Sequence, residues 1–83
     1  MDTWQQRSRP NRLERKFIFE SYDSTREFLD RLGEHSQAVN RFPDISFGTT
    51  YVNITIRPES EDEKTPLTKD DHRFAEEIDG LLD

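Results

Sequence analysis

Few residues of this chain could carry acid–base or metal chemistry. It has two histidines, His35 and His72, and no cysteine, which removes thiol catalysis, disulfides and thiolate metal sites. His72 stands beside Asp70 and Asp71, but two distant histidines without a paired spacing are a weak signal for a metal. A solvated helix start accounts better for this group. We therefore expect no bound metal and no cofactor.

The segment 37–44, Gln-Ala-Val-Asn-Arg-Phe-Pro-Asp, joins an expected helix to an expected strand. Pro43 ends the helix, because a residue that precedes proline is pushed out of the helical region. Gln37 and Phe42 cannot exchange protons, and Arg41 stays protonated at any working pH. An exposed Phe42 beside Arg41 would suit contact with a partner. The alternative is that Phe42 turns inward and Arg41 is merely solvated.

Trp4 is a further candidate contact residue. It stands on a polar N-terminal arm, residues 1–12, which we interpret as mostly extended and able to pair at a sheet edge. A lone tryptophan there has little to pack on locally, so it either folds onto its own sheet or docks on another chain. The remainder, 13–83, is expected to form a single domain.

Apolar residues alternate with polar ones in 13–19 and in 50–57, which is typical of strands with one buried face. Arg15 interrupts the apolar side of the first. A short strand is expected over 45–47, with Gly48 marking a turn or bulge. The acidic stretch 58–66 has no large apolar residue and is expected to be a solvated connection.

Two amphipathic helices alternate with these strands. The first has capping-box spacing at Ser24 to Glu27, and the second opens with the pattern Thr68 to Asp71. A histidine on the first apolar stripe is expected at the edge of the core, where burial favours its neutral form. The stripes consist of Phe28, Leu32, His35 and Val39 in the first helix, and of Phe74, Ala75, Ile78, Leu81 and Leu82 in the second. Such one-sided elements favour an α+β fold, with an antiparallel sheet covered by helices on one face.

Charge and size limit the function classes. The 83 residues carry a net charge of −6, and 58–83 hold ten acidic and three basic residues. This balance disfavours binding to phosphate backbones or anionic lipid. No apolar run is long enough for a membrane span or a signal peptide, so we expect a cytoplasmic protein. A core this small favours pairing with a second copy or a partner.

The ordered pattern resembles the pterin-4a-carbinolamine dehydratase family. The similar stretches run from Trp4 to Leu82: Leu13-Glu14-Arg15-Lys16-Phe17-Ile18-Phe19, Pro43-Asp44, Val52-Asn53-Ile54-Thr55-Ile56 and Leu67-Thr68-Lys69-Asp70-Asp71. The helix that precedes the tryptophan in the family has no counterpart here. The resemblance implies a four-stranded antiparallel sheet with two helices on one face, and dimers formed by extending the sheet edge to edge.

The resemblance also implies that the acid–base groups are gone. The family's motif glutamate corresponds to Gln37, its paired histidines to Arg41 and Phe42, and its strand-end histidine to a position on or beside Glu59. A subgroup with such losses assists Rubisco assembly in bacteria with α-carboxysomes. The resemblance to this subgroup implies a non-catalytic homodimer that binds Rubisco subunits, in the cytoplasm or associated with carboxysomes. It also implies that the partner-binding residues are Arg41, Phe42, Trp4 and Gln37.

Two other functions stay open. One is an active or weakly active dehydratase, which would need His35 or Glu59 to replace the missing groups. The other is a dimerisation cofactor of another protein, as some members of the family are.

Overall fold

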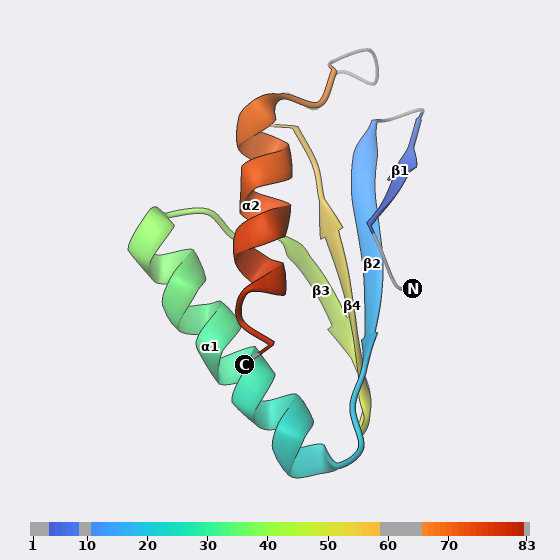
Figure 1. Ribbon diagram of the computed structural model, residues 1–83, viewed down its shortest axis with the longest axis vertical. Helices are drawn as coiled ribbons and strands as arrows, with labels where there is room; N and C mark the ends of the chain where they lie inside the picture. The colour runs from blue at the N-terminus through green and yellow to red at the C-terminus, as the bar shows by residue number, and fades with distance from the viewer. Residues whose placement is uncertain (1–3, 9–10, 59–65, 83) are drawn as a thin grey trace.

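The computed structural model describes residues 4–8, 11–58 and 66–82. Figure 1 shows one sheet with two helices packed beside it. The elements, in chain order, are β1 (Gln5–Arg7), β2 (Arg12–Ile18), α1 (Tyr22–Val39), β3 (Asp44–Phe47), β4 (Tyr51–Ile56) and α2 (Lys69–Asp79). The expected α+β class is confirmed, and Gln5–Arg7 of the N-terminal arm pair at a sheet edge.

The sheet is antiparallel throughout, with the strand order β1-β2-β4-β3. Directly paired residues of antiparallel strands point to the same face, so Leu13 shares a face with Ile56, and Phe17 with Val52. This face is buried, whereas the residues between them point away from the helices. The alternation read from the sequence therefore fixes which side of the sheet forms the core.

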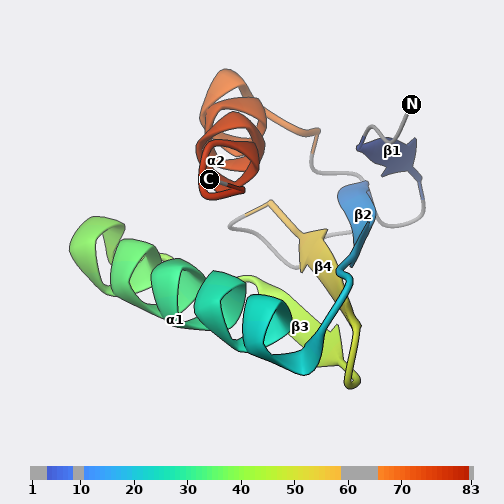
Figure 2. The ribbon, with the colours of Figure 1, turned by 60° about the horizontal axis from the view of Figure 1, so that its bottom comes forward.

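Both helices cover the same face of the sheet, as the second view shows (Figure 2). Phe28 of α1 packs against Phe17, with ring centroids 4.8 Å apart, and against Phe19 at 5.2 Å. The core joins β2, β4 and the two helices, and consists of Leu13, Phe17, Phe28, Leu32, Val52, Ile54, Ile56, Phe74, Ala75 and Ile78.

The start of α1 differs from the prediction. The N-cap is Ser21, whose side chain accepts a hydrogen bond from the backbone N–H of Ser24 at 3.1 Å. Ser21 stands three residues before the donor Ser24, which is the spacing of a cap, and its extended backbone suits it to this role. The prediction of a capping box at Ser24 was wrong. The buried stripe of α1 runs through Thr25, Phe28, Leu32 and Ser36, which leaves Val39 exposed.

The predicted start of α2 is confirmed. Thr68 caps the helix, and Thr68 and Asp71 form both halves of a capping box. The helix ends at Asp79, before Leu81 and Leu82, of which Leu82 is exposed. Most of the connection predicted over 58–66, including Glu59, lies outside the described residues.

The two sheet edges differ. β1 consists of three polar residues, whereas β3 is four residues long and carries Ile45 and Phe47 on the side that faces the helices. These two side chains are nevertheless 41% and 57% exposed. The apolar side of β3 is thus only partly covered within one chain.

Candidate functional site

The candidate site lies where α1 ends and the chain turns into β3. Asn40 adopts the left-handed region, with φ of 56°, and its backbone N–H donates to the carbonyl of Gln37 at 3.3 Å. The N–H of Arg41 donates to the carbonyl of Ser36 at 3.0 Å. These bonds satisfy the last carbonyls of the helix. They also fix the direction in which the next two side chains leave it.

Arg41 points back into the molecule. Its guanidinium pairs with the carboxylate of Asp71 on α2 and donates to the carbonyl of Arg57 at 3.0 Å. The same guanidinium lies over the ring of Phe74, 4.9 Å from its centroid. Arg41 therefore joins the exit of α1, the end of β4 and the first turns of α2.

Asp71 is a nearly fully buried carboxylate, and its hydrogen bonds offset the free-energy cost of burying its charge. In addition to the ion pair with Arg41, Oδ2 of Asp71 accepts a hydrogen bond from the backbone N–H of Thr68 at 2.8 Å and another from the Thr68 hydroxyl at 3.3 Å. A buried charge is tolerated when it is paired and hydrogen-bonded in this way. One side chain thus serves both as a helix cap and as the anchor of Arg41.

Phe42 points the other way. Its side chain is 67% exposed, and Gln37 and Val39 on the last turn of α1 are exposed as well. The alternative in which Phe42 turns inward and Arg41 is merely solvated was therefore wrong on both counts. The turn holds a cation inside and presents an aromatic ring to solvent.

His35 lies at the edge of the core, as the sequence predicts. Its ring stacks on Phe74, with centroids 5.8 Å apart, and its Nε2 lies 3.0 Å from Oε1 of Glu77. His72 is exposed on α2. Among the described residues there is no group of side chains that could hold a metal ion. Within the same ranges no helix is long and apolar enough to cross a membrane.

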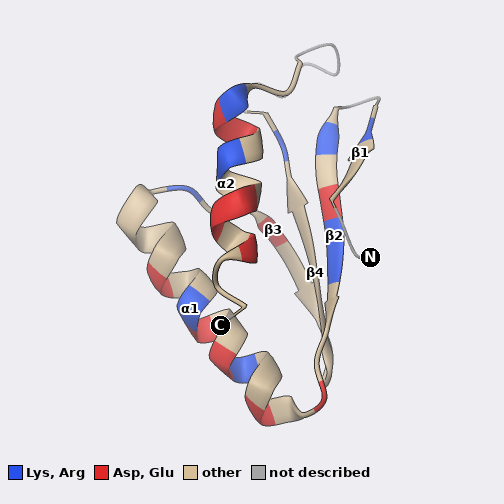
Figure 3. Ribbon diagram, viewed as in Figure 1, with Lys and Arg blue, Asp and Glu red and all other residues tan. Residues whose placement is uncertain are grey.

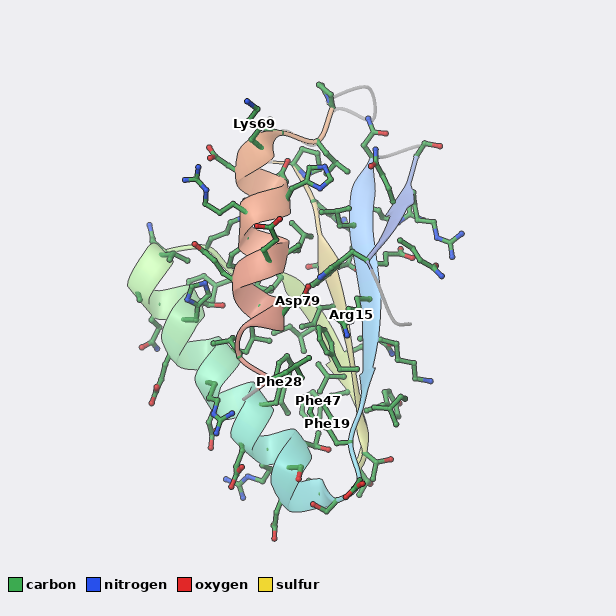
Figure 4. The ribbon with its side chains drawn as sticks, in the orientation of Figure 1. Arg15, Phe19, Phe28, Phe47, Lys69 and Asp79 are labelled. Atoms are coloured by element: carbon green, nitrogen blue, oxygen red, sulfur yellow. The ribbon has the colours of Figure 1, made fainter. Side chains whose placement is uncertain are left out.

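Trp4 folds onto its own sheet, the first of the two alternatives. Its indole N–H donates to Oδ1 of Asp79 at 2.8 Å, and its ring meets Phe17 edge to face at 6.0 Å. Arg15 donates to the same oxygen at 2.6 Å and lies over the ring of Phe17 (Figure 4). Asp79 therefore holds both the N-terminal arm and the arginine that interrupts the apolar side of β2.

Sequence reasoning missed the acidic partners of these residues. The capping pattern that begins at Thr68 marks Asp71 as a cap, but no local pattern links it to Arg41, thirty positions earlier. The same holds for Asp79 and Trp4, which are 75 positions apart. The one usable signal was Arg15 on the apolar side of a predicted strand. An arginine in that place indicates a buried hydrogen-bond acceptor elsewhere in the chain.

The chain matches the family described as "Pterin 4 alpha carbinolamine dehydratase" over residues 1–81. A protein of Rubrobacter xylanophilus named "Putative pterin-4-alpha-carbinolamine dehydratase" is 35% identical over 69 residues, which are 83% of this chain and 62% of that protein. The chain thus spans less than two thirds of the length of this relative.

Solved structures agree on the fold. A pterin dehydratase-like protein identified as a RuBisCO assembly factor in the α-carboxysome superposes with a TM-score of 0.85 and 37% identity, over 96% of this chain and 89% of that one. A transcriptional coactivator/pterin dehydratase from Brucella melitensis gives a TM-score of 0.81 at 18% identity, over 96% of this chain and 82% of that chain. The second likeness is evidence for the fold alone.

Proposed function

Because this chain belongs to the pterin 4 alpha carbinolamine dehydratase family, we propose that it is a non-catalytic binding module of that family which assists Rubisco assembly. It would act as a chaperone-like factor in the cytoplasm of bacteria with α-carboxysomes. The similarity to a RuBisCO assembly factor over nearly the whole chain supports this role.

The observation that carries the proposal is that Arg41 is a permanent cation bound to other side chains of the protein. Dehydration of a carbinolamine needs groups that exchange protons near neutral pH, and imidazole is the usual one. Arg41, which corresponds to the first of the family's paired histidines, stays protonated and is committed to Asp71 and Phe74. Gln37 and Phe42, at two other motif positions, have no proton to exchange. The fourth position, at or beside Glu59, lies outside the described residues.

The same turn offers a contact surface. Exposed aromatic side chains are frequent anchors of protein interfaces, and Phe42 stands at a fixed place after a capped helix. We assign Phe42 as the anchor and Gln37 as its polar neighbour. Arg41 and Trp4, the other two predicted contact residues, act indirectly. Arg41 fixes the direction of the turn, and Trp4 fixes the position of the N-terminal arm.

The proposal includes a homodimer that pairs through β3. An edge strand with exposed apolar side chains is a template for another strand, and Ile45 and Phe47 meet that description. β1 is shorter and polar, so it is the poorer template. A β3–β3 pair would extend the sheet across two chains and cover both side chains.

Co-expression with Rubisco large and small subunits tests the role. The expected result is a higher yield of assembled holoenzyme than without the chain, and a reduced yield with Phe42→Ala. Tyr22→Ala is the matched control, because Tyr22 is an exposed aromatic at the opposite end of α1. An unchanged holoenzyme yield in the presence of the folded chain would count against the proposal.

A second candidate is dehydratase activity, which the family and the named relative from Rubrobacter xylanophilus favour. It would require His35 or Glu59 to act as the acid or base; the ring nitrogen of His35 already pairs with Glu77, and Glu59 lies outside the described residues. A direct assay with a pterin-4a-carbinolamine decides this: turnover above buffer that is lost in His35→Gln would establish an enzyme, and none is expected.

A further inference from the structure

The outward face of the sheet is open over the described residues. Both helices lie on the opposite face, and alternation turns one set of strand side chains outward (Figure 2). The partners Glu14 and Thr55, and Lys16 and Asn53, lie at its centre, while Ile18 and Tyr51 lie at the hairpin end. None of these six side chains is fully buried.

Charge separates sharply between this face and the helices. The outward face carries four cations, Arg7, Arg12, Lys16 and Arg57, and two carboxylates, Glu14 and Asp44. The helices α1 and α2 carry nine carboxylates and four cations. Figure 3 shows blue on β1, blue with one red band on β2, and red bands alternating with blue ones on α2. In a chain of net charge −6, the described residues of this face have a positive balance.

Ion pairs hold most of these charges in place. Glu14 accepts from Arg12 at 2.6 Å and from Arg7 at 3.3 Å, and Arg57 pairs with Asp44 at 2.9 Å. Hydrogen bonding to Arg12 lowers the pKa of Glu14 below its ordinary value, so this carboxylate is ionised at neutral pH. Lys16 has no carboxylate partner among the described residues and lies over the ring of Tyr51, 5.0 Å from its centroid. The cationic side chains of this face are therefore held in place on the strands.

The hairpin end of the face is apolar. A Cβ atom on Gly48 would lie 2.2 Å from the ring of Tyr51, so this ring covers the glycine directly across the strand pair. Ile18, the residue opposite Tyr51, is 65% exposed. Ile18 also borders a cavity of about 280 Å³ on the α1 side of the sheet, which is lined by Phe19, Phe28, Leu81 and Leu82 and by the polar residues Ser24, Glu27 and Arg31. An apolar anchor point thus adjoins the cationic strands.

We infer that this open face docks an acidic segment of a partner protein, with carboxylates over Lys16 and Arg12 and an apolar side chain beside Tyr51 and Ile18. Opposite potentials steer such a segment to the sheet, while the acidic helices repel it from the other side. A polypeptide can place an uncharged residue over Glu14 at the centre of the face, whereas a phosphate backbone carries a charge at every step. The inference does not rest on the proposed function, since it concerns a different surface.

Binding of a labelled peptide to the full chain tests this inference. The probe is an Asp- and Glu-rich peptide with a single Phe, and the comparison peptide has Lys at every acidic position. We expect the acidic peptide to bind, to shift the backbone NMR signals of β2 and β4, and to weaken as NaCl rises from about 0.05 to 0.5 M. Lys16→Glu should weaken binding about tenfold.

Arg26→Glu on α1 is the matched control, because it changes the net charge equally from the helical side. If both variants weaken binding alike, only net charge matters and the inference fails. It also fails if the Lys peptide binds as well, if the shifts fall on the helices, or if a single-stranded oligonucleotide binds more tightly than the peptide. Salt-sensitive self-association without peptide would assign the face to a second copy instead.

Discussion

Arg41 and Asp71 form an ion pair that ties the exit of α1 to the first turn of α2, and the acidic partner is nearly fully buried. Asp71 also completes the capping box with Thr68. The position that is expected to be catalytic in relatives thus takes part in holding two helices together.

Asp71→Ala should lower the free energy of unfolding by about 2–4 kcal/mol, since it removes a cap and strands the guanidinium of Arg41. Arg41→Ala should cost less, because Asp71 keeps its bonds to Thr68. Urea unfolding of both variants and of the double variant measures the coupling, expected at about 1–3 kcal/mol. Strictly additive losses would show that the pair contributes nothing as a unit.

Trp4→Phe should cost about 1–3 kcal/mol, because it keeps an aromatic ring against Phe17 but removes the N–H that donates to Oδ1 of Asp79. Asp79→Ala should cost more, since it removes the acceptor of both the Trp4 indole and the Arg15 guanidinium. Circular dichroism in urea compares them. In the Asp79→Ala background, where no side-chain oxygen is left to accept from the indole N–H, Trp4→Phe should add little; an undiminished effect there would mean that Trp4 acts through its ring alone.

Glu14 should give the chain an acid-sensitive contribution to stability. Its pKa is lowered in the folded state, chiefly by the hydrogen bond from Arg12, so its stabilisation is complete above the unfolded value of 4.5 and is lost as pH falls through the folded pKa. The difference in urea midpoint between the native chain and Glu14→Gln should therefore shrink below pH 4.5. A difference that stays constant down to full protonation would contradict this linkage.

Asn40→Ala should destabilise the chain by about 1 kcal/mol, because a residue with a Cβ atom and no local hydrogen-bonding side chain is strained in the left-handed region. Asn40→Gly should stay within a few tenths of a kcal/mol of the native chain, since glycine adopts this conformation freely. Thermal unfolding of the pair checks this. Equal losses in both variants would point to the asparagine side chain instead.

Ile45→Lys should convert the proposed dimer to a monomer, because it places a charge on the apolar side of the pairing strand. Analytical ultracentrifugation measures the mass in solution. Gln6→Lys is the control, since it places the same charge on the opposite edge strand. A native chain that is monomeric at high concentration would remove the basis of the β3 pairing.

Local patterns predicted most of the fold. The alternation of Val52, Ile54 and Ile56 gave the buried face of β4, and the spacing of Thr68 and Asp71 gave the start of α2. The start of α1 was misplaced because Ser21 and Ser24 both satisfy the capping spacing, and only backbone conformation separates them.

The side-chain directions at the site could not be predicted. Whether Arg41 or Phe42 turns inward depends on Asp71 and Phe74, which the chain reaches only after two further strands. No short-range pattern contains that information. The fold could thus be predicted from the periodicity of apolar residues. The side-chain directions at the site could not, because they depend on partners distant in the sequence.

The unequal edges of the sheet bear on how many chains can associate. If β3 pairs with β3 about a two-fold axis, each chain uses its one good pairing edge, and the outer edges of the pair are the three-residue strands β1. Each of these carries Arg7 and is held to its own chain by the neighbouring Trp4. Such ends offer little to an incoming strand, so association stops at two chains, and open-ended fibre growth has no starting point.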